Sequence, residues 1–194
     1  MQMDSNFLEY FKKFNFLSLE DLKLIYSSVK IKKLSPGERV VSEGEKFYFT
    51  VIILKGLLRS YIIMSTEEER TVYLAHEGMP NGCPESIFED KPASVTIEAM
   101  EPSILLYIDI HGLDKIARDR PALLRLRIKL MEHAFMEVVN RVKFLTDFTQ
   151  EERYTYLRDN HPQLIKRVSQ KYLASYIGVT PVSLSRIKAR ISNS

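Results

Sequence analysis

The stretch QKYLASYIGVTPVSLSRIKAR, residues 170–190, constrains the fold more than any other part of this chain. Its apolar and turn residues recur at the spacing of two short helices: Leu173, Ala174 and Ile177 in the first, Gly178 between them, and Leu184 and Ile187 in the second. Gly178 can take a positive φ, Thr180 can cap the second helix, and Pro181 suits its first position. The stretch therefore predicts two short helices joined by a tight turn.

This pattern resembles the helix-turn-helix of DNA-binding regulators, and six of its positions agree at once. The alternative is an ordinary helical hairpin. Charge supports the first interpretation, because residues 161–194 hold six Lys and Arg, while all 25 Asp and Glu lie before His161. A basic segment on a mildly acidic body is typical of a module that binds a polyanion.

A heptad repeat marks the longest predicted helix, residues 122–145. Its apolar residues are spaced alternately by four and three, as in the a and d positions of a coiled coil: Leu124, Ile128, Met131, Phe135, Val138, Val142 and Leu145. A second apolar stripe consists of Leu123, Leu130, Met136 and Val139. We expect one face to pack on the body of the protein and the heptad face to form a parallel homodimer.

Short segments rich in β-branched and aromatic residues, broken by Gly and Pro, fill residues 39–108. Strands are expected at 39–41, 47–54, 57–64, 71–75, 94–99 and 105–108, which favours a small antiparallel barrel or roll. An irregular insert at 76–92 contains a possible helical turn at 85–88. Residues 4–29 predict one or two helices, with a possible capping box at Ser18. The segment from Pro162 or Gln163 to Arg167 fits either a helix or a strand.

Composition excludes several other classes. The single cysteine, Cys83, rules out a disulfide framework or a zinc site built from several thiolates. The N-terminus does not read as a signal peptide, and no run is apolar enough to span a membrane, so we expect a cytoplasmic protein. The four histidines are scattered and no catalytic motif stands out, so we expect no enzyme, no metal site and no cofactor.

In their order, these features resemble the CRP–FNR family of bacterial transcription regulators. The motifs are Pro36-Gly37-Glu38 with Glu43-Gly44-Glu45, then Lys55-Gly56 between strands, the heptad helix and the helix-turn-helix pattern. The resemblance implies an α+β fold with an effector-sensing β-roll domain at 1–120, a dimerisation helix at 121–147 and a DNA-binding domain at 148–194. It also implies a homodimer that binds double-stranded palindromic DNA and contacts RNA polymerase.

Cyclic-AMP-binding members of that family bind the nucleotide with a short segment between two strands, the nucleotide cassette. The present sequence departs from those members in this segment. Aligning Gly82 and Ser94 with the ends of the cassette places Cys83 where those members have a glutamate and Ala93 where they have an arginine. Without a guanidinium, a phosphate loses its strongest partner. We therefore expect no tight binding of cyclic nucleotides. The candidates for lining an effector pocket are Gly82, Cys83, Glu85, Ser86, Ala93 and Ser94.

The second helix of the motif, Thr180–Ile191, is expected to read DNA in the major groove. Arg186 is the strongest candidate for a base contact, because a guanidinium can bind guanine O6 and N7 together, and the family has an arginine at the matching position. Val182 can contact a thymine methyl group. The full candidate set is Ser169, Gln170, Lys171, Thr180, Pro181, Val182, Ser183, Ser185, Arg186, Lys188 and Arg190. The β-hairpin wing of many family members is expected to be missing or truncated here.

One alternative function remains open. The β-roll of this family also serves as a ligand-binding module attached to other machinery, so a small-molecule-binding regulatory module without a direct DNA role is the second hypothesis. The basic, acid-free C-terminal segment favours the DNA reader.

Overall fold

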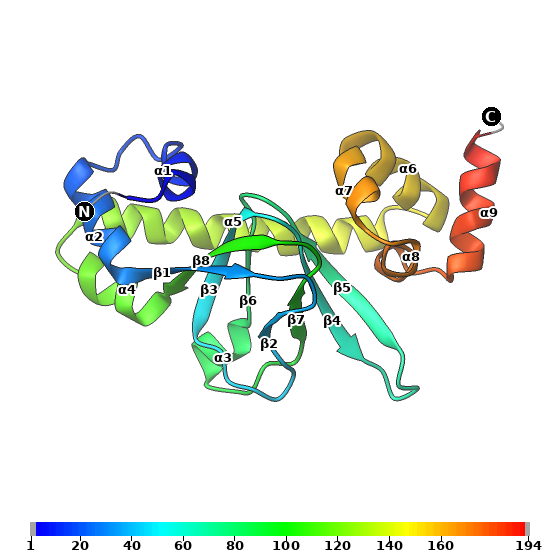
Figure 1. Ribbon diagram of the computed structural model, residues 1–194, viewed down its shortest axis with the longest axis horizontal. Coiled ribbons are helices and arrows are strands. Elements are labelled where there is room, and N and C mark those ends of the chain that lie inside the picture. Colours follow the sequence, from blue (N-terminus) through cyan, green and yellow to red (C-terminus); the bar gives the residue numbers. More distant parts are fainter. Residues whose placement is uncertain (1–2, 193–194) are drawn as a thin grey trace. The chain divides into compact units, whose positions relative to one another are not determined.

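A computed structural model describes residues 3–192. Its elements are α1 (Ser5–Phe11), α2 (Leu19–Ser28), β1 (Val29–Leu34), β2 (Arg39–Val41), β3 (Phe49–Lys55), β4 (Leu58–Ile63), β5 (Glu69–Ala75), β6 (Pro80–Gly82), α3 (Pro84–Glu89), β7 (Thr96–Ala99), β8 (Ser103–Asp109), α4 (Ile110–Ala117), α5 (Pro121–Thr146), α6 (Gln150–Asn160), α7 (Pro162–Arg167), α8 (Gln170–Ile177) and α9 (Pro181–Ser192), as labelled in Figure 1. None of the described helices is long and apolar enough to cross a membrane.

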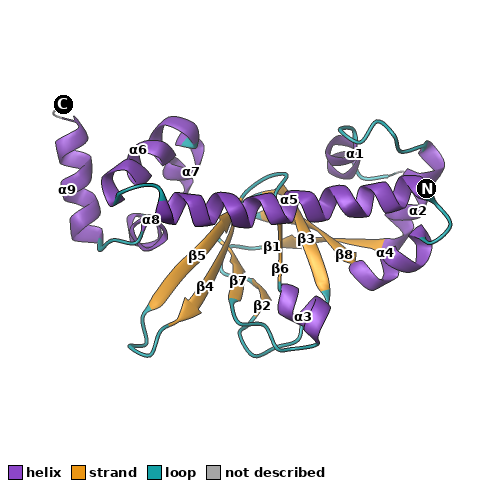
Figure 2. Cartoon of the chain, turned by 180° about the vertical axis from the view of Figure 1, so that it is seen from behind, coloured by secondary structure: helices purple, strands orange, loops and turns teal. Residues whose placement is uncertain are grey.

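The strands form two four-stranded sheets, in the orders β1-β8-β3-β6 and β2-β7-β4-β5. Strand β8 pairs antiparallel with β1 on one side and with β3 on the other. Non-consecutive strands are therefore neighbours, as in a roll, and the two ends of the strand region lie together in one sheet. Figure 2 draws the strands in orange and shows β3 between β6 and β8. This arrangement confirms the α+β fold with an antiparallel β-roll.

The chain divides into two compact units. The first comprises the residues up to Ser60 together with Ala75–Met136, and the second comprises Tyr61–Leu74 together with the residues from Glu137 onward. The second unit thus contains most of the β4–β5 hairpin as well as the C-terminal helices. The domain boundaries predicted from the sequence, after residues 120 and 147, divide the chain into three consecutive segments. These segments describe expected functional parts, and their boundaries stay a prediction.

The hydrophobic core of the first unit includes the N-terminal half of α5. Leu123, Leu126 and Leu130 are buried there against apolar side chains of α1, α2, α4, β3 and β8. The expected second stripe is thus correct for Leu123 and Leu130. It is wrong for Met136, which is 48% exposed. The buried face of α5 instead includes Leu126, because this residue lies three residues after Leu123 and four before Leu130 and therefore on the same side of the helix.

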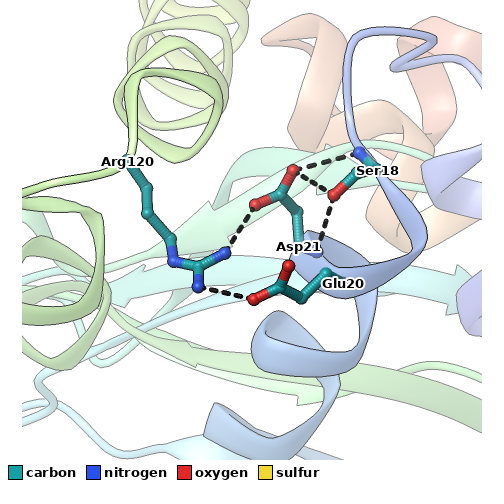
Figure 3. A network of polar contacts seen from close by, with 4 residues as sticks. All are labelled: Ser18, Glu20, Asp21 and Arg120. Carbon is teal, nitrogen blue, oxygen red and sulfur yellow. Dashed lines mark hydrogen bonds and ion pairs between the residues drawn. The ribbon is translucent and has the colours of Figure 1, made fainter.

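A polar network fixes the start of α5 against α2 (Figure 3). Ser18 and Asp21 form the expected capping box at the start of α2. Arg120, directly before α5, donates to Asp21 Oδ1 at 3.3 Å and to Glu20 Oε1 at 2.7 Å. The hydrogen bonds from Ser18 are the largest influence on the pKa of the buried Asp21, and with Arg120 they lower it despite burial, so the carboxylate stays charged.

Most predicted elements are present, with differences where local chemistry is ambiguous. Residues 162–167, which fit either a helix or a strand, form helix α7 with Pro162 at its first position. Strand β6 was not expected, since Pro80-Asn81-Gly82 has turn chemistry, yet it pairs with β3. Strand β1 was not expected either, although its apolar residues alternate with lysines. The predicted truncation of the wing concerns the end of the chain, where residues 193–194 lie outside the described residues.

Candidate nucleic-acid interface

Helices α8 and α9 and the turn between them have the predicted form. The apolar residues that join them are all buried: Leu173, Ala174, Ile177, Leu184 and Ile187. Gly178 ends α8 with a φ of 81°, in the left-handed region that favours glycine. Ser169 caps α8 by accepting from the Tyr172 N–H, and Thr180 Oγ1 accepts from the Ser183 N–H at the start of α9. Sequence and geometry therefore agree on a helix–turn–helix unit.

Arg153 of α6 fastens this unit to the end of α5. Its guanidinium donates to three main-chain carbonyls, those of Phe144 at 3.1 Å, Leu145 at 2.5 Å and Ile177 at 2.9 Å. These carbonyls lie at the C-terminal ends of α5 and α8, where a positive charge is favourable and free acceptors need partners. Arg153 therefore holds two helix ends together beside the turn at Gly178.

The outer face of α9 presents Val182, Ser185, Arg186 and Ala189, which are all exposed. Their spacing of three and four residues places them on one side of the helix, and we name these four residues the reading face. Arg186 is its only charged member, and it forms no hydrogen bond or ion pair with the described residues. An exposed guanidinium without an internal partner is free to bind an external acceptor.

The other basic candidates differ from Arg186. Arg190 pairs with Glu151 of α6 at 2.8 Å, and the Lys188 amino group lies 5.6 Å from the centre of the Tyr154 ring. Lys171 is exposed at the start of α8, next to Ser169 and Gln170. Thr180 and Ser183 also bond to one another through their hydroxyl groups at 3.0 Å. The charges expected to contact phosphate are thus partly engaged within the protein, and Arg186 is not.

A link between the helix–turn–helix unit and the β4–β5 hairpin was missed by sequence reasoning. The Thr71 N–H donates to Ser175 Oγ at 2.8 Å. Arg141 of α5 donates to the carbonyls of Val72 and Tyr176, both at 2.9 Å, so one side chain joins the hairpin to the end of α8. These residues have no distinctive spacing in the sequence, and Arg141 is one of several cations along the predicted long helix, so no signal in the sequence singles out the link.

The heptad stripe of α5 is exposed along its whole length. Its seven members, Leu124, Ile128, Met131, Phe135, Val138, Val142 and Leu145, range from 41% to 67% exposed. By contrast, the buried residues Leu123, Leu126 and Leu130 are at most 5% exposed on the same helix. A continuous exposed apolar stripe with heptad spacing is typical of surfaces that associate with another helix.

The candidate effector residues form the short segment around α3. Gly82 lies in β6 opposite Thr50, and a Cβ there would lie 3.0 Å from the Phe49 carbonyl oxygen. Cys83 and Ala93 are buried, and Ser86 Oγ donates to the Lys91 carbonyl at 2.7 Å. The structure brings together Glu85 and Ser94 directly, since Glu85 Oε1 accepts from the N–H and the hydroxyl of Ser94, both at 2.7 Å.

Two titrating groups in this segment have shifted pKa values. Burial alone would raise the pKa of Glu85, but the hydrogen bonds from Ser94 and from the main-chain N–H of Glu85 together lower it below its usual value, so the group is a carboxylate. Burial and, less strongly, the charge of Glu85 raise the pKa of Cys83 to about 12, so its thiol stays protonated and unreactive at neutral pH. Among residues 3–192, no three His, Cys, Asp or Glu side chains lie close enough to hold a metal ion.

Comparisons with known proteins agree with this geometry. Residues 31–120 match the family model of the cyclic nucleotide-binding domain. A search of curated proteins found no significant match. FixK2 from Bradyrhizobium japonicum has a similar structure, with a TM-score of 0.68 and 17% identity over 85% of each chain.

Two further solved structures share the fold. A CooA mutant from Carboxydothermus hydrogenoformans has a TM-score of 0.68 and 17% identity over 100% of this chain and 87% of that one. A putative transcriptional regulator of the CRP/FNR family from Eubacterium rectale has a TM-score of 0.66 and 19% identity over 95% and 88%. These findings agree with the resemblance drawn from the sequence: residues 31–120 are similar to a cyclic nucleotide-binding domain, and the chain has the fold of solved CRP–FNR-type regulators.

Proposed function

We propose that this protein is a homodimeric, sequence-specific DNA-binding transcriptional regulator of the CRP–FNR type, and not an enzyme. It reads a palindromic site with α9 in the major groove of each half-site. We further propose that it acts in the cytoplasm and contacts RNA polymerase, as the resemblance of its sequence to the CRP–FNR family implies. The observation that carries the proposal is Arg186, an exposed guanidinium on the outer face of α9 that has no hydrogen bond or ion pair with the part of the chain that the structure describes.

The chemistry of the C-terminal residues supports this assignment. A guanidinium can donate two parallel hydrogen bonds to guanine O6 and N7, and this arrangement identifies guanine among the four bases. Lys171 and the hydroxyl groups of Ser169, Thr180 and Ser183 lie at the N-terminal ends of α8 and α9 and can contact phosphate. No acidic residue is present from His161 onward to repel the DNA backbone.

The exposed heptad stripe supports the homodimer. Its a positions include the β-branched Ile128 and Val142, and its d positions include Leu124 and Leu145, a distribution that favours parallel two-stranded coiled coils. A parallel pair has a two-fold axis, and the same axis relates the half-sites of palindromic DNA. Dimerisation through the heptad stripe would therefore present two reading faces, one to each half-site.

Substitution of Arg186 tests the proposed function. DNA sites for the wild type are first selected in vitro from random duplexes. Arg186→Ala is expected to lose about 1–3 kcal/mol of discrimination between guanine and the other bases in each half-site, because one bidentate contact disappears. A repeated selection with the variant should therefore show relaxed preference at one base pair per half-site. Binding of the wild type should weaken by about two orders of magnitude between 50 and 200 mM salt if about four phosphates are contacted.

Arg158→Ala is the matched control, because Arg158 is an exposed arginine of α6 that pairs with its neighbour Asp159. The control should leave the selected motif unchanged. An unchanged motif for Arg186→Ala as well would refute the role of this residue. Failure of the wild type to enrich any sequence would reject the DNA-reading function itself.

We further propose that cyclic AMP does not control this protein. Ala93 supplies no cation for a cyclic phosphate, and the Glu85 carboxylate occupies the N–H and hydroxyl of Ser94. A second anion placed there would meet a negative charge and would have to displace these hydrogen bonds. Titration calorimetry should detect no binding of cyclic AMP at micromolar concentrations, and a micromolar dissociation constant would contradict the proposal.

The second candidate function is a ligand-binding regulatory module without a DNA role. The match of residues 31–120 to the cyclic nucleotide-binding domain favours it, because that domain alone implies ligand recognition. The two candidates differ in their behaviour with DNA. A module of this kind would show neither a selected sequence nor a dependence of binding on Arg186.

A further inference from the structure

The apolar tip of α9 is unusual within the C-terminal helices. Among the described residues of α6 to α9, the exposed large apolar side chains are Tyr156 and Val182, and Val182 is 61% exposed. Val182 lies at the second position of α9, directly after the exposed Pro181. The nearby hydroxyl groups of Thr180 and Ser183 are hydrogen-bonded to one another. The first turn of α9 therefore presents an apolar surface.

We propose that Val182 reads the C5-methyl group of a thymine in each half-site. This inference rests on the proposed function and names a chemical feature of the DNA that the site selects. In the major groove, the thymine methyl is the apolar group that distinguishes this base, and apolar side chains recognise it. A valine in a helix has one strongly preferred rotamer, so little side-chain entropy is lost when it packs against that methyl.

The spacing of the reading face predicts where the thymine lies. Val182 and Arg186 are four residues apart, so their Cβ atoms are about 5–6 Å apart on the same side of α9. Successive bases on one strand are about 3.4 Å apart along the DNA axis. The thymine read by Val182 therefore lies one or two base pairs from the guanine read by Arg186.

Replacement of thymine by deoxyuridine tests this proposal, because it removes only the methyl group. The selected duplex is synthesised with one thymine replaced at a time in both half-sites, and binding is measured by gel shift. One position, within two base pairs of the Arg186-dependent guanine, should weaken binding by the wild type about fourfold per half-site, the value for one buried methyl-sized group. Thymines outside the half-sites serve as DNA controls.

Val182→Ala completes the test as a double-mutant cycle, in which the protein substitution is combined with the replacement of thymine by deoxyuridine. The variant should bind the thymine duplex less tightly than the wild type and should lose the deoxyuridine effect. Phe88→Ala, which truncates a similarly exposed apolar side chain on α3, should keep the full effect. If the wild type selects a DNA sequence and no thymine methyl matters, the proposal about Val182 is overturned while the proposed function stands.

Two other results also decide the question. A deoxyuridine effect that persists in Val182→Ala would assign the methyl contact to another residue and would overturn the proposal. Absence of any selected sequence would overturn both this inference and the function on which it rests.

Discussion

Phe135→Glu is expected to convert the proposed dimer into a monomer. Phe135 is the central member of the heptad stripe and is 67% exposed in the single chain, so the substitution leaves the fold of the monomer intact. In a two-fold dimer it removes two buried phenyl rings, each worth about 1.5–3 kcal/mol, and brings two carboxylates together. The dimer dissociation constant should therefore rise by at least about 100-fold.

Sedimentation velocity at micromolar concentration measures this change, and gel shift with the selected palindrome measures its consequence. A monomer binds one half-site at a time, so affinity for the palindrome should fall to that for an isolated half-site. Met136→Glu is the matched control, because Met136 is the adjacent residue of α5, is also exposed, and lies outside the heptad stripe. A dimeric Phe135→Glu protein would show that the stripe is not the dimer interface.

Residues with regular spacing were predictable from the sequence. The heptad stripe was identified from intervals of four and three, and the structure leaves all seven of its members exposed. The turn at Gly178 and the cap at Ser169 were also predictable, because each depends on residues within one helical turn. Local periodicity and capping chemistry are visible in one sequence because the interacting positions are a few residues apart.

Contacts between distant polar residues were not predictable in this way. Thr71 and Ser175 are 104 positions apart, and Arg141 reaches Val72 across 69 positions. In the sequence, Arg141 resembles any exposed arginine that flanks a coiled-coil seam. Strand β6 was missed for a related reason, since its pairing with β3 overrides the turn preference of Pro80-Asn81-Gly82. These features depend on tertiary contacts between residues far apart in the chain, and a single sequence does not show which residues are partners.

A second large effect is expected on the stability of the second unit, through the link that Arg141 makes between the β4–β5 hairpin and α8. Arg141 is half-buried, and its guanidinium lies 3.9 Å from the Tyr176 ring centre and 5.3 Å from that of Phe144. The two rings are themselves stacked, with centres 5.6 Å apart. Together with the bonds to Val72 and Tyr176, these contacts attach the hairpin to α8 through one cation.

Arg141→Met should destabilise the second unit by about 3 kcal/mol, because two hydrogen bonds from a charged donor are lost and methionine keeps the apolar stem in place. Burial lowers the pKa of Arg141, and its Nη1 is buried without a hydrogen-bond partner, so relief of desolvation offsets part of the gross loss. Chemical denaturation followed by far-UV circular dichroism measures the change in the free energy of unfolding.

Amide hydrogen exchange separates loss of this link from a general loss of stability. The Thr71 N–H, which is bonded to Ser175 Oγ, should exchange faster in Arg141→Met than in the wild type under native conditions. Arg141→Lys should behave almost like Arg141→Met, because one ammonium group cannot reproduce the guanidinium fork between the carbonyls of Val72 and Tyr176.

Arg158→Met controls for loss of an arginine at the surface, where the partner is the adjacent Asp159. It should change neither the free energy of unfolding nor the exchange of the Thr71 amide. If Arg141→Met resembled this control, the contacts of Arg141 would contribute nothing to holding the hairpin on α8. If the amide exchanges faster and affinity for the selected DNA falls with it, the hairpin positions the helix that reads DNA.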